Sequence, residues 1–297
     1  MATAPSSTGS SAGSSTGSSA EIPVIADVEE AVEALEFVAA LVTRLGEEAT
    51  RRQSGAVEQR KPAAALTGSV VTDVDLETER VIDDALRERF PADGIIGEEG
   101  ADRPPADPEH GRTWVVDPID GTLNYARRLG PWSVVASAWR GPRERPQAES
   151  VAVWTGGYLY TAVAGQGAFV RVASADAEPR RLRLEGPAEA GGVVRAGAGV
   201  LGAIKDAGWL PKVVESSAAE VVSIADGRVM GTLRHGGDRR DLHGPALLVA
   251  EAGGAVVPLD GEPLSGVSRS LVLAHPGAAD SLVALAQATL PVEGPAD

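Results

Sequence analysis

The chain has 297 residues, of which 43% are hydrophobic, and this is enough for one large α/β domain or two intimate halves. Its 42 acidic and 27 basic residues give a net charge of −15, so a nucleic-acid backbone is repelled on average and we expect no nucleic-acid partner. The chain has no cysteine, which excludes a disulfide framework, a thiolate zinc site and a cysteine nucleophile. Any metal must use oxygen or histidine ligands, and hard cations are favoured.

The N-terminal segment, residues 1–20, consists almost only of small polar residues and alanine. It cannot bury enough apolar surface to offset chain entropy, so we expect a disordered tail followed by one domain over residues 21–297. A secretory signal would need a positive start and an apolar stretch, and this segment has neither; a membrane span would need about 18 apolar residues in a row. We therefore expect a cytoplasmic protein with no membrane partner.

Two helices are predicted in the first third of the domain. Apolar residues recur at helical spacing over 27–52, and Asp27 is a suitable N-cap. After a looser stretch, a short β-branched run leads into a second apolar helical pattern that begins near Leu76 and reaches Phe90. Pro91 ends this helix.

Strands dominate the middle of the chain. A brief apolar run in GIIGEEG, residues 94–100, ends in Glu98 and Glu99, and residues 113–116 read as a buried strand. Further apolar runs separated by glycine-rich turns predict a meander of strands at 133–139, 150–156, 158–165 and 167–172. The last third alternates short strands and helices, including a helix that follows Asp241.

The segment WVVDPIDGTLNY, residues 114–125, carries two carboxylates directly after a buried strand. Pro118 cannot extend a sheet, and Gly121 frees the backbone where a helix can begin at Thr122. Asp117 and Asp120 repel each other unless a cation compensates them, and a helix N-terminus beside them offers N–H groups to an anion. Mg²⁺ with a substrate phosphate suits this arrangement better than zinc or calcium. The alternative is an Asx turn with a capping aspartate.

Five segments in order resemble landmarks of the inositol monophosphatase family, which comprises Mg²⁺-dependent, lithium-sensitive phosphatases. They are VTDVD at 71–75, GIIGEEG at 94–100, WVVDPIDGTLNY at 114–125, AVAGQGAF at 162–169 and RDLHGPALLVAEAGG at 240–254. The resemblance covers the chain from about residue 27 to its end. It implies a layered α-β-α-β-α sandwich with the active site between two halves, and usually a homodimer.

The resemblance also implies a set of metal ligands. Glu98, Asp117 and the carbonyl of Ile119 would hold one Mg²⁺ ion. Asp117, Asp120 and Asp241 would hold a second. The alternative role for Asp241 is a purely structural one, in which its side chain caps the helix that follows.

A third, weaker ion would involve Glu98 and Asp75. Thr122, hydrogen-bonded to Asp75, would orient the attacking water, and the N–H groups of Gly121 and Thr122 would bind the phosphate. The resemblance thus implies in-line attack of metal-activated water on phosphorus, with no covalent phosphoenzyme. Asp75 equally suits the role of a helix cap, while Glu99 needs no role beyond solvation.

Several departures from the family pattern concern the substrate. Arg234 stands seven residues before Asp241, where inositol-hydrolysing members commonly place a glutamate. An arginine there suits a carboxylate or second phosphate better than a neutral polyol, and the alternative is an arginine exposed to solvent. Arg240 stands beside Asp241, where the family usually has a tryptophan, and Ala64 stands where many members have a lysine. The segment VAVWTGG, residues 151–157, lacks the proline that usually follows this strand.

The expected function is a phosphomonoesterase acting on a small phosphorylated metabolite resembling inositol monophosphate. Histidinol phosphate, 3′-phosphoadenosine 5′-phosphate, a sugar phosphate and an intermediate of specialised metabolism are alternative substrates. A second class of function is a non-catalytic phosphate-binding relative, which the departures around the substrate motivate; against it, all the expected metal carboxylates and Thr122 are present. A dinucleotide-binding oxidoreductase is disfavoured, because no G-x-G-x-x-G lies between a strand and a helix.

Overall fold

The computed structural model describes residues 25, 27–60, 70–142, 146–174, 177–235, 239–259 and 270–290, without the side chains of Arg60, Ala198, Arg239 and Asp241. The tail expected over residues 1–20 and Ala64 lie outside these ranges.

The larger sheet of the described chain is mixed and has eight strands in the order β10-β9-β8-β7-β6-β5-β3-β4. The strands are β3 Gly94–Ile96, β4 Asp102–Arg103, β5 Arg112–Asp120, β6 Ser133–Arg140, β7 Gln147–Thr155, β8 Tyr158–Val163, β9 Gly167–Val172 and β10 Arg180–Arg181. Neighbours from β5 to β9 are consecutive and antiparallel, which confirms the predicted meander. The one parallel pair in this sheet joins β3 to β5.

The smaller sheet of the described residues has five strands in the order β12-β11-β13-β15-β14. They are β11 Val193–Ala196, β12 Leu210–Lys212, β13 Gly231–His235, β14 Ala255–Pro258 and β15 Ser270–Ala274. A separate short ladder pairs β1, Glu58–Arg60, with β2, Val70–Thr72. This alternation of strands and helices in the last third agrees with the sequence.

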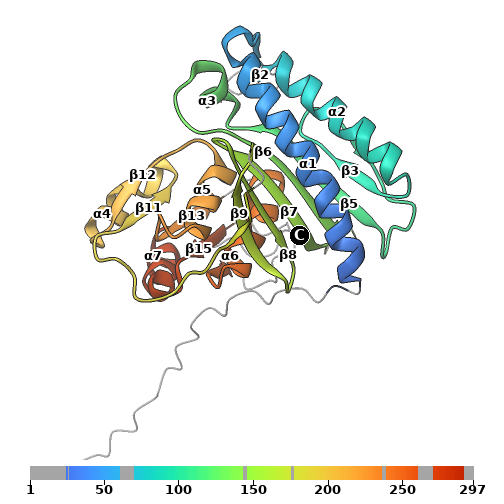
Figure 1. Ribbon diagram of the computed structural model, residues 1–297. Helices are drawn as coiled ribbons and strands as arrows, with labels where there is room; N and C mark the ends of the chain where they lie inside the picture. The colour runs from blue at the N-terminus through green and yellow to red at the C-terminus, as the bar shows by residue number, and fades with distance from the viewer. Residues whose placement is uncertain are drawn as a thin grey trace, which may run out of the picture.

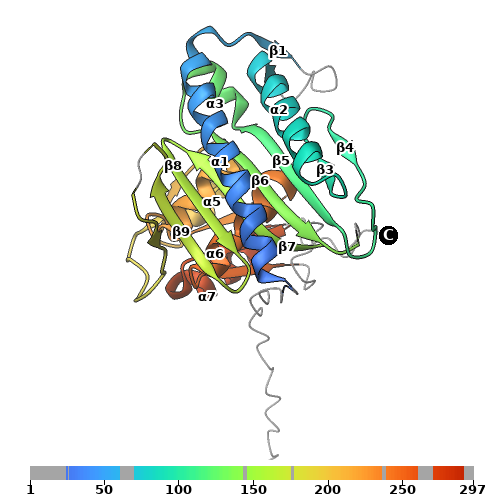
Figure 2. The same ribbon diagram turned by 45° about the vertical axis from the view of Figure 1, so that its right-hand side comes forward.

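Helices lie on both outer faces and between the sheets (Figure 1). They are α1 Val28–Arg52, α2 Asp73–Arg89, α3 Thr122–Arg127, α4 Leu201–Asp206, α5 Ser217–Ala225, α6 Gly244–Glu251 and α7 Ala279–Thr289. The pair α1 and α2 covers one face of the larger sheet (Figure 2), α5 and α6 fill the space between the sheets, and α4 and α7 lie against the far side of the smaller sheet. The result is the α-β-α-β-α sandwich that the family resemblance implies.

Side-chain alternation along the strands explains the five layers. On β5, Trp114 and Val116 pack with α1 and α2, whereas Val115 between them packs with α5 and α6. On β15, Leu273 faces the same central layer and Val272 faces α7. Both sheets are thus buried on two sides, as continuous apolar runs in their sequences require.

The start of each of the first two helices is fixed by a side-chain cap. Asp27 accepts a hydrogen bond of 2.9 Å from the Glu30 N–H, as the sequence predicts for α1. The second helix begins at Asp73 rather than near Leu76, because Thr72 is its N-cap and forms a capping box with Asp75. Asp75 therefore lies in the first turn of α2 instead of preceding it.

Strand β5 continues past Pro118, contrary to the expectation that the strand ends at Val116. Asp117 pairs with Val135 and Asp120 pairs with Ser133, so three steps on β5 match two on β6. The extra residue forms a bulge, in which a proline without an N–H is tolerated. The bulge keeps both aspartates attached to the sheet while it bends the chain towards α3.

Within the described ranges, no helix is both long and apolar enough to cross a bilayer.

Candidate active site

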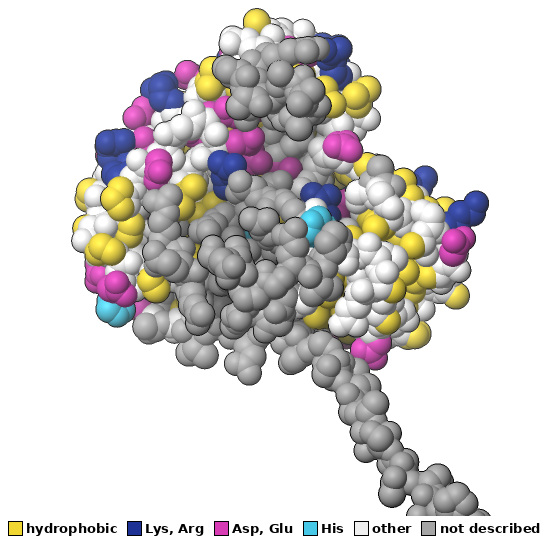
Figure 3. Space-filling view, turned by 180° about the vertical axis from the view of Figure 1, so that it is seen from behind, with side chains coloured by type: hydrophobic (Ala, Val, Ile, Leu, Met, Phe, Trp, Pro, Cys, Tyr) yellow, Lys and Arg dark blue, Asp and Glu magenta, His cyan; other side chains and the backbone are white. Residues whose placement is uncertain are grey.

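A cleft of about 740 Å³ opens where the end of β5 meets the half of the molecule that carries the smaller sheet. Most of the predicted site residues line it: Glu98, Asp117, Ile119, Asp120, Gly121, Thr122 and Arg234. Seen from behind, Asp and Glu side chains gather beside the notch between the upper and the lower right part of the molecule (Figure 3). These residues come from segments that lie more than a hundred positions apart in the sequence, and the fold brings them to one cleft.

Glu98 and Asp117 approach the cleft together because Glu98 follows β3, Asp117 lies near the end of β5, and these two strands are parallel neighbours. Ile96 on β3 pairs with Val115 on β5, and both strands end at the same edge of the sheet. Glu98 is partly exposed and lines the cleft, whereas Asp117 is only 5% exposed. Asp117 accepts a 3.0 Å hydrogen bond from the Ile119 N–H, so the turn role that was the alternative interpretation is present as well.

Asp120 holds the N-terminus of α5. Its carboxylate accepts hydrogen bonds from the Ser216 hydroxyl at 2.6 Å, the Ser217 N–H at 2.9 Å and the Ala218 N–H at 2.9 Å. The positive end of α5 therefore favours the ionised carboxylate. The sequence does not predict this contact directly; the signal it offers is the pair of serines at the start of an apolar helical run.

Gly121 allows the two halves to meet at this point. Its φ of +86° is left-handed, and a Cβ there would lie 3.0 Å from both the Glu215 carbonyl oxygen and the Ser216 Cβ. A side chain would push apart the segments that bring Asp120 and α5 together.

Asp75 is fully buried and hydrogen-bonded to Thr122, as the resemblance implies. The Thr122 hydroxyl lies 2.9 Å from Asp75 Oδ1 and 3.0 Å from the Ile119 carbonyl oxygen, so its single proton is shared between two acceptors. The Thr72 N–H donates to the other Asp75 oxygen at 2.9 Å. Burial raises the pKa of Asp75 to about 6, with hydrogen bonds from Thr72 and Thr122 opposing the shift and the charge of Glu99 adding to it.

Arg234 has partners within the protein. It projects from β13, donates a 2.8 Å hydrogen bond to the Ser217 hydroxyl, and lies 3.9 Å from a carboxylate oxygen of Glu220. Glu220 is 2% exposed, and burial raises its pKa while Arg234 lowers it. The sequence does not predict a role for Glu220 beside Arg234. The arginine, at 23% side-chain exposure, is not the solvent-exposed residue of the alternative interpretation.

Asp241 lies three residues before the first residue of α6. The N-cap position of that helix is occupied by His243, whose side chain makes no capping hydrogen bond, so Asp241 does not stand at the N-cap. Asp241 instead belongs to a π-helical turn over Arg239–His243, and its side chain lies outside the described part of the structure.

The chemical type of the donors in the cleft, carboxylate oxygens, suits a hard cation. Buried or partly buried carboxylates line the cleft, and oxygen ligands of this type suit Mg²⁺. Within the described part of the chain, no three Asp, Glu or His side chains form a metal-binding group by themselves. A complete set would need a further donor, and Asp241 is the candidate that the sequence offers.

The two sheets with a carboxylate-lined cleft beside them define a layered α/β sandwich with a candidate cation site. The model of the inositol monophosphatase family matches residues 25–290. The chain belongs to this family, whose members are in general Mg²⁺-dependent phosphatases.

Relatives with assigned names agree with this membership. Inositol-1-monophosphatase of Mycobacterium leprae is 34% identical over 235 residues, which cover 73% of this chain and 78% of that protein. Human inositol monophosphatase 2 is 27% identical over 251 residues, covering 78% and 83% of the two chains. The structure of Thermotoga maritima IMPase superimposes with a TM-score of 0.73 at 21% identity, covering 87% of this chain and 98% of that one, which supports the fold.

Proposed function

We propose that the protein is a Mg²⁺-dependent phosphomonoesterase that hydrolyses a small phosphorylated metabolite resembling inositol monophosphate. The observation that carries this proposal is the cleft itself, in which Asp117, Asp120 and Glu98 lie beside the Thr122–Asp75 hydrogen bond. A site for two carboxylate-held cations and an orienting hydroxyl suits hydrolysis by water without a covalent enzyme intermediate.

The metal ligands in this proposal are Glu98, Asp117, the Ile119 carbonyl, Asp120 and Asp241. They would hold two or three ions, and Asp75 would lie near the third ion, which would be the most weakly bound. Mg²⁺ would supply Lewis acidity to the phosphoryl and leaving-group oxygens. Asp120 is already fixed by three donors from α5 and the residue before it, so its orientation does not depend on the ion. Such preorganised ligands reduce the cost of forming the site.

Thr122 and Asp75 would orient the attacking water. Asp75 accepts a hydrogen bond from the Thr122 hydroxyl, which leaves the lone pairs of that oxygen free to accept a hydrogen bond from a water molecule in the cleft. The N–H groups of Gly121 and Thr122 begin α3 and would bind the phosphate oxygens. Around them, the partly buried cleft would limit access of bulk water.

A direct test of these roles compares Thr122→Val with Thr122→Ser. Valine removes the hydroxyl at nearly constant volume, so we expect kcat to fall roughly 100-fold or more, while serine retains most activity. Steady-state kinetics at saturating Mg²⁺ would measure both variants, with thermal unfolding as a check on folding. Equal activity of the valine and serine variants would contradict the role of the hydroxyl.

Arg234 would bind the part of the substrate that leaves with the ester oxygen. Its guanidinium lines the cleft, and Glu220 and Ser217 hold it in place. A carboxylate or second phosphate on the leaving group suits this position, so nucleoside bisphosphates and anionic sugar phosphates fit it better than histidinol phosphate, which carries a cationic amine, or a neutral polyol phosphate. A non-catalytic phosphate-binding protein is the alternative from a different class.

The experiment that tests the function is phosphate release with Mg²⁺ over a panel of substrates. The panel contains inositol 1-phosphate, histidinol phosphate, 3′-phosphoadenosine 5′-phosphate, fructose 1,6-bisphosphate and several sugar monophosphates, with Asp117→Asn as the inactive control. Lithium-sensitive release that needs Mg²⁺ supports the proposal. Mg²⁺ binding without release from any member of the panel favours the non-catalytic alternative.

Arg234→Met tests how the leaving group is recognised. A glutamate at this position would face Glu220, so methionine is the cleaner replacement. Loss of a charge-assisted hydrogen bond should lower kcat/KM roughly tenfold for a substrate with a second anionic group, and change it little for a neutral polyol phosphate. An equal fall for both substrates would mean that Arg234 only supports the cleft wall.

We further propose that residues 21–297 form a single phosphatase domain, that the protein acts in the cytoplasm, and that it forms a homodimer. Size-exclusion chromatography with light scattering would test the last point.

A further inference from the structure

Glu79 is a buried carboxylate that none of the roles above uses. It lies on α2 and is 4% exposed. One carboxylate oxygen accepts a 2.7 Å hydrogen bond from the Glu99 N–H and the other a 2.8 Å bond from the Ala101 N–H. Burying a charge is costly unless its partners are good, and the two partners resolved here are both N–H groups of the loop after β3.

The loop is shaped to lie against this carboxylate. A Cβ on Gly97 would lie 2.5 Å from the Glu79 Cδ and 2.6 Å from each of its oxygens, so a side chain there would displace the carboxylate. The Gly97 N–H donates to the Ala101 carbonyl oxygen at 2.6 Å and closes the loop. Residues 97–101 therefore wrap around the end of the Glu79 side chain.

Arg240 holds the same loop from the other half of the molecule. Its guanidinium donates a 2.8 Å hydrogen bond to the Gly97 carbonyl oxygen. Arg240 is the residue that stands where the family usually has tryptophan, and its neighbour in the sequence is Asp241. The contact ties the loop after β3 to the segment that leads into α6.

Together these contacts fix the backbone on both sides of Glu98. Arg240 binds the carbonyl of the peptide that precedes Glu98, and Glu79 binds the N–H of the peptide that follows it. Peptide units are planar, so holding both planes fixes φ and ψ of the residue between them. Hydrogen bonds to charged groups are roughly twice as strong as neutral ones, which suits them to this task.

We propose that Glu79 and Arg240 are positioning residues that fix the Glu98 carboxylate for metal binding. This inference rests on the proposed function, in which Glu98 is a Mg²⁺ ligand. Neither residue needs to touch the ion or the substrate, because both act through the backbone of Glu98. Groups that orient a metal ligand typically change metal affinity 10- to 100-fold when they are replaced.

The decisive variant is Glu79→Gln, which keeps the size of the side chain but presents an amide NH₂ to one of the two N–H donors. We expect its Mg²⁺ dissociation constant, measured by isothermal titration calorimetry in the absence of substrate, to rise about tenfold or more. The matched control is Glu77→Gln on the same helix, where Glu77 pairs with Arg80 at 2.8 Å on the surface. The control should bind Mg²⁺ like the unaltered protein.

A second pair of variants keeps the test valid if Glu79→Gln fails to fold. Arg240→Met removes the donor to Gly97, and Arg240→Lys retains a donor, so Mg²⁺ affinity should fall in the first and recover in the second. Combining Glu79→Gln with Arg240→Met should cost less than the sum of the two effects, since both act on Glu98.

Glu98→Gln separates failure of this inference from failure of the proposed function. If Glu98→Gln weakens Mg²⁺ binding while folded Glu79→Gln and Arg240→Met bind it normally, the positioning role is wrong and the ligand role stands. If Glu98→Gln also binds Mg²⁺ normally, the ligand assignment is wrong and the positioning role falls with it.

Discussion

Asp117→Asn is expected to lower kcat/KM roughly 10³-fold or more while the protein stays folded. Asparagine has nearly the same shape, and its amide oxygen can still accept the 3.0 Å hydrogen bond from the Ile119 N–H. What it loses is the negative charge that would be shared by two cations, and several kcal/mol of transition-state stabilisation depend on those cations. Steady-state kinetics across a wide range of Mg²⁺ concentration, with urea unfolding in parallel, would measure both effects.

Two comparisons sharpen this result. Asp84→Asn on the exposed face of α2 should retain full activity, since Asp84 pairs only with Arg80 among the described residues and its side chain is 62% exposed. Asp120→Asn should lose activity as well, but it should also cost about 1–3 kcal/mol of stability, because Asp120 accepts three hydrogen bonds from the start of α5. Full activity in Asp117→Asn would remove this residue from the metal site.

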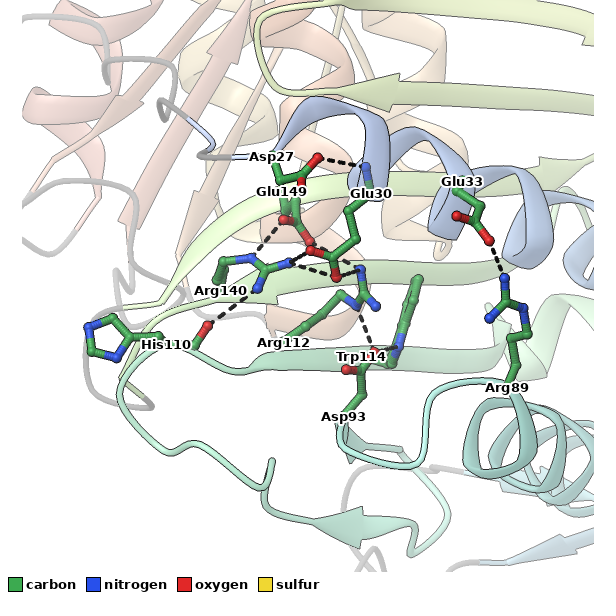
Figure 4. A network of polar contacts seen from close by, with 10 residues as sticks. All are labelled: Asp27, Glu30, Glu33, Arg89, Asp93, His110, Arg112, Trp114, Arg140 and Glu149. Atoms are coloured by element: carbon green, nitrogen blue, oxygen red, sulfur yellow. Dashed lines mark hydrogen bonds and ion pairs between the residues drawn. The ribbon is translucent and has the colours of Figure 1, made fainter.

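Arg112→Met is expected to destabilise the protein by about 3–5 kcal/mol without changing the active site. Arg112 has a 3% exposed side chain at the start of β5 (Figure 4), where it donates a 2.7 Å hydrogen bond to Asp93 and lies 3.8 Å from Glu149. Its guanidinium also lies over the Phe90 ring at 4.7 Å. Removing this cation leaves the carboxylates of Asp93 and Glu149 buried with fewer partners. An uncompensated buried charge destabilises the folded state strongly.

Urea unfolding would measure the loss, with Arg51→Met as the control. Arg51 pairs with Glu48 on the surface of α1, where both side chains are largely exposed, so its removal should leave the unfolding midpoint almost unchanged. Well below the unfolding midpoint, kcat/KM of Arg112→Met should match that of the unaltered protein. A stability change as small as that of the control would mean that Arg140, which pairs with both Glu30 and Glu149, compensates fully for the lost charge.

The sequence predicts those parts of the fold and site that depend on local pattern. The N-cap of α1, the meander from β5 to β9 and the helix after Gly121 follow from periodicity and turn residues, and all three are present. The start of α2 was misplaced because Thr72 and Asp75 cap it reciprocally, and a capping box reads as a helix start only once its N-cap is identified. The strand β5 was read too short because a bulge accommodates Pro118.

Contacts between distant segments could not be read in this way. The Asp120–Ser216 bond joins residues 96 positions apart, and the Arg240–Gly97 bond joins residues 143 apart. The periodicity of a helix predicts only which of its positions face the surface or the core. It does not predict the partners of Glu79 and Glu220, which lie on other elements. Such roles depend on how the layers are stacked, which the local sequence does not encode.

The two sheets divide the cleft in a way that matters for protein engineering. The larger sheet and α3 supply Glu98, Asp117 and Thr122, whereas Ser217 and Arg234 come from the part built around the smaller sheet. A library randomised at Ser217, Arg234 and His235, which line the cleft, would therefore sample new leaving-group preferences while Glu98, Asp117 and Thr122 stay unchanged. Asp120 and Gly121 sit at the junction of both parts, so directed evolution of selectivity should leave these two positions untouched.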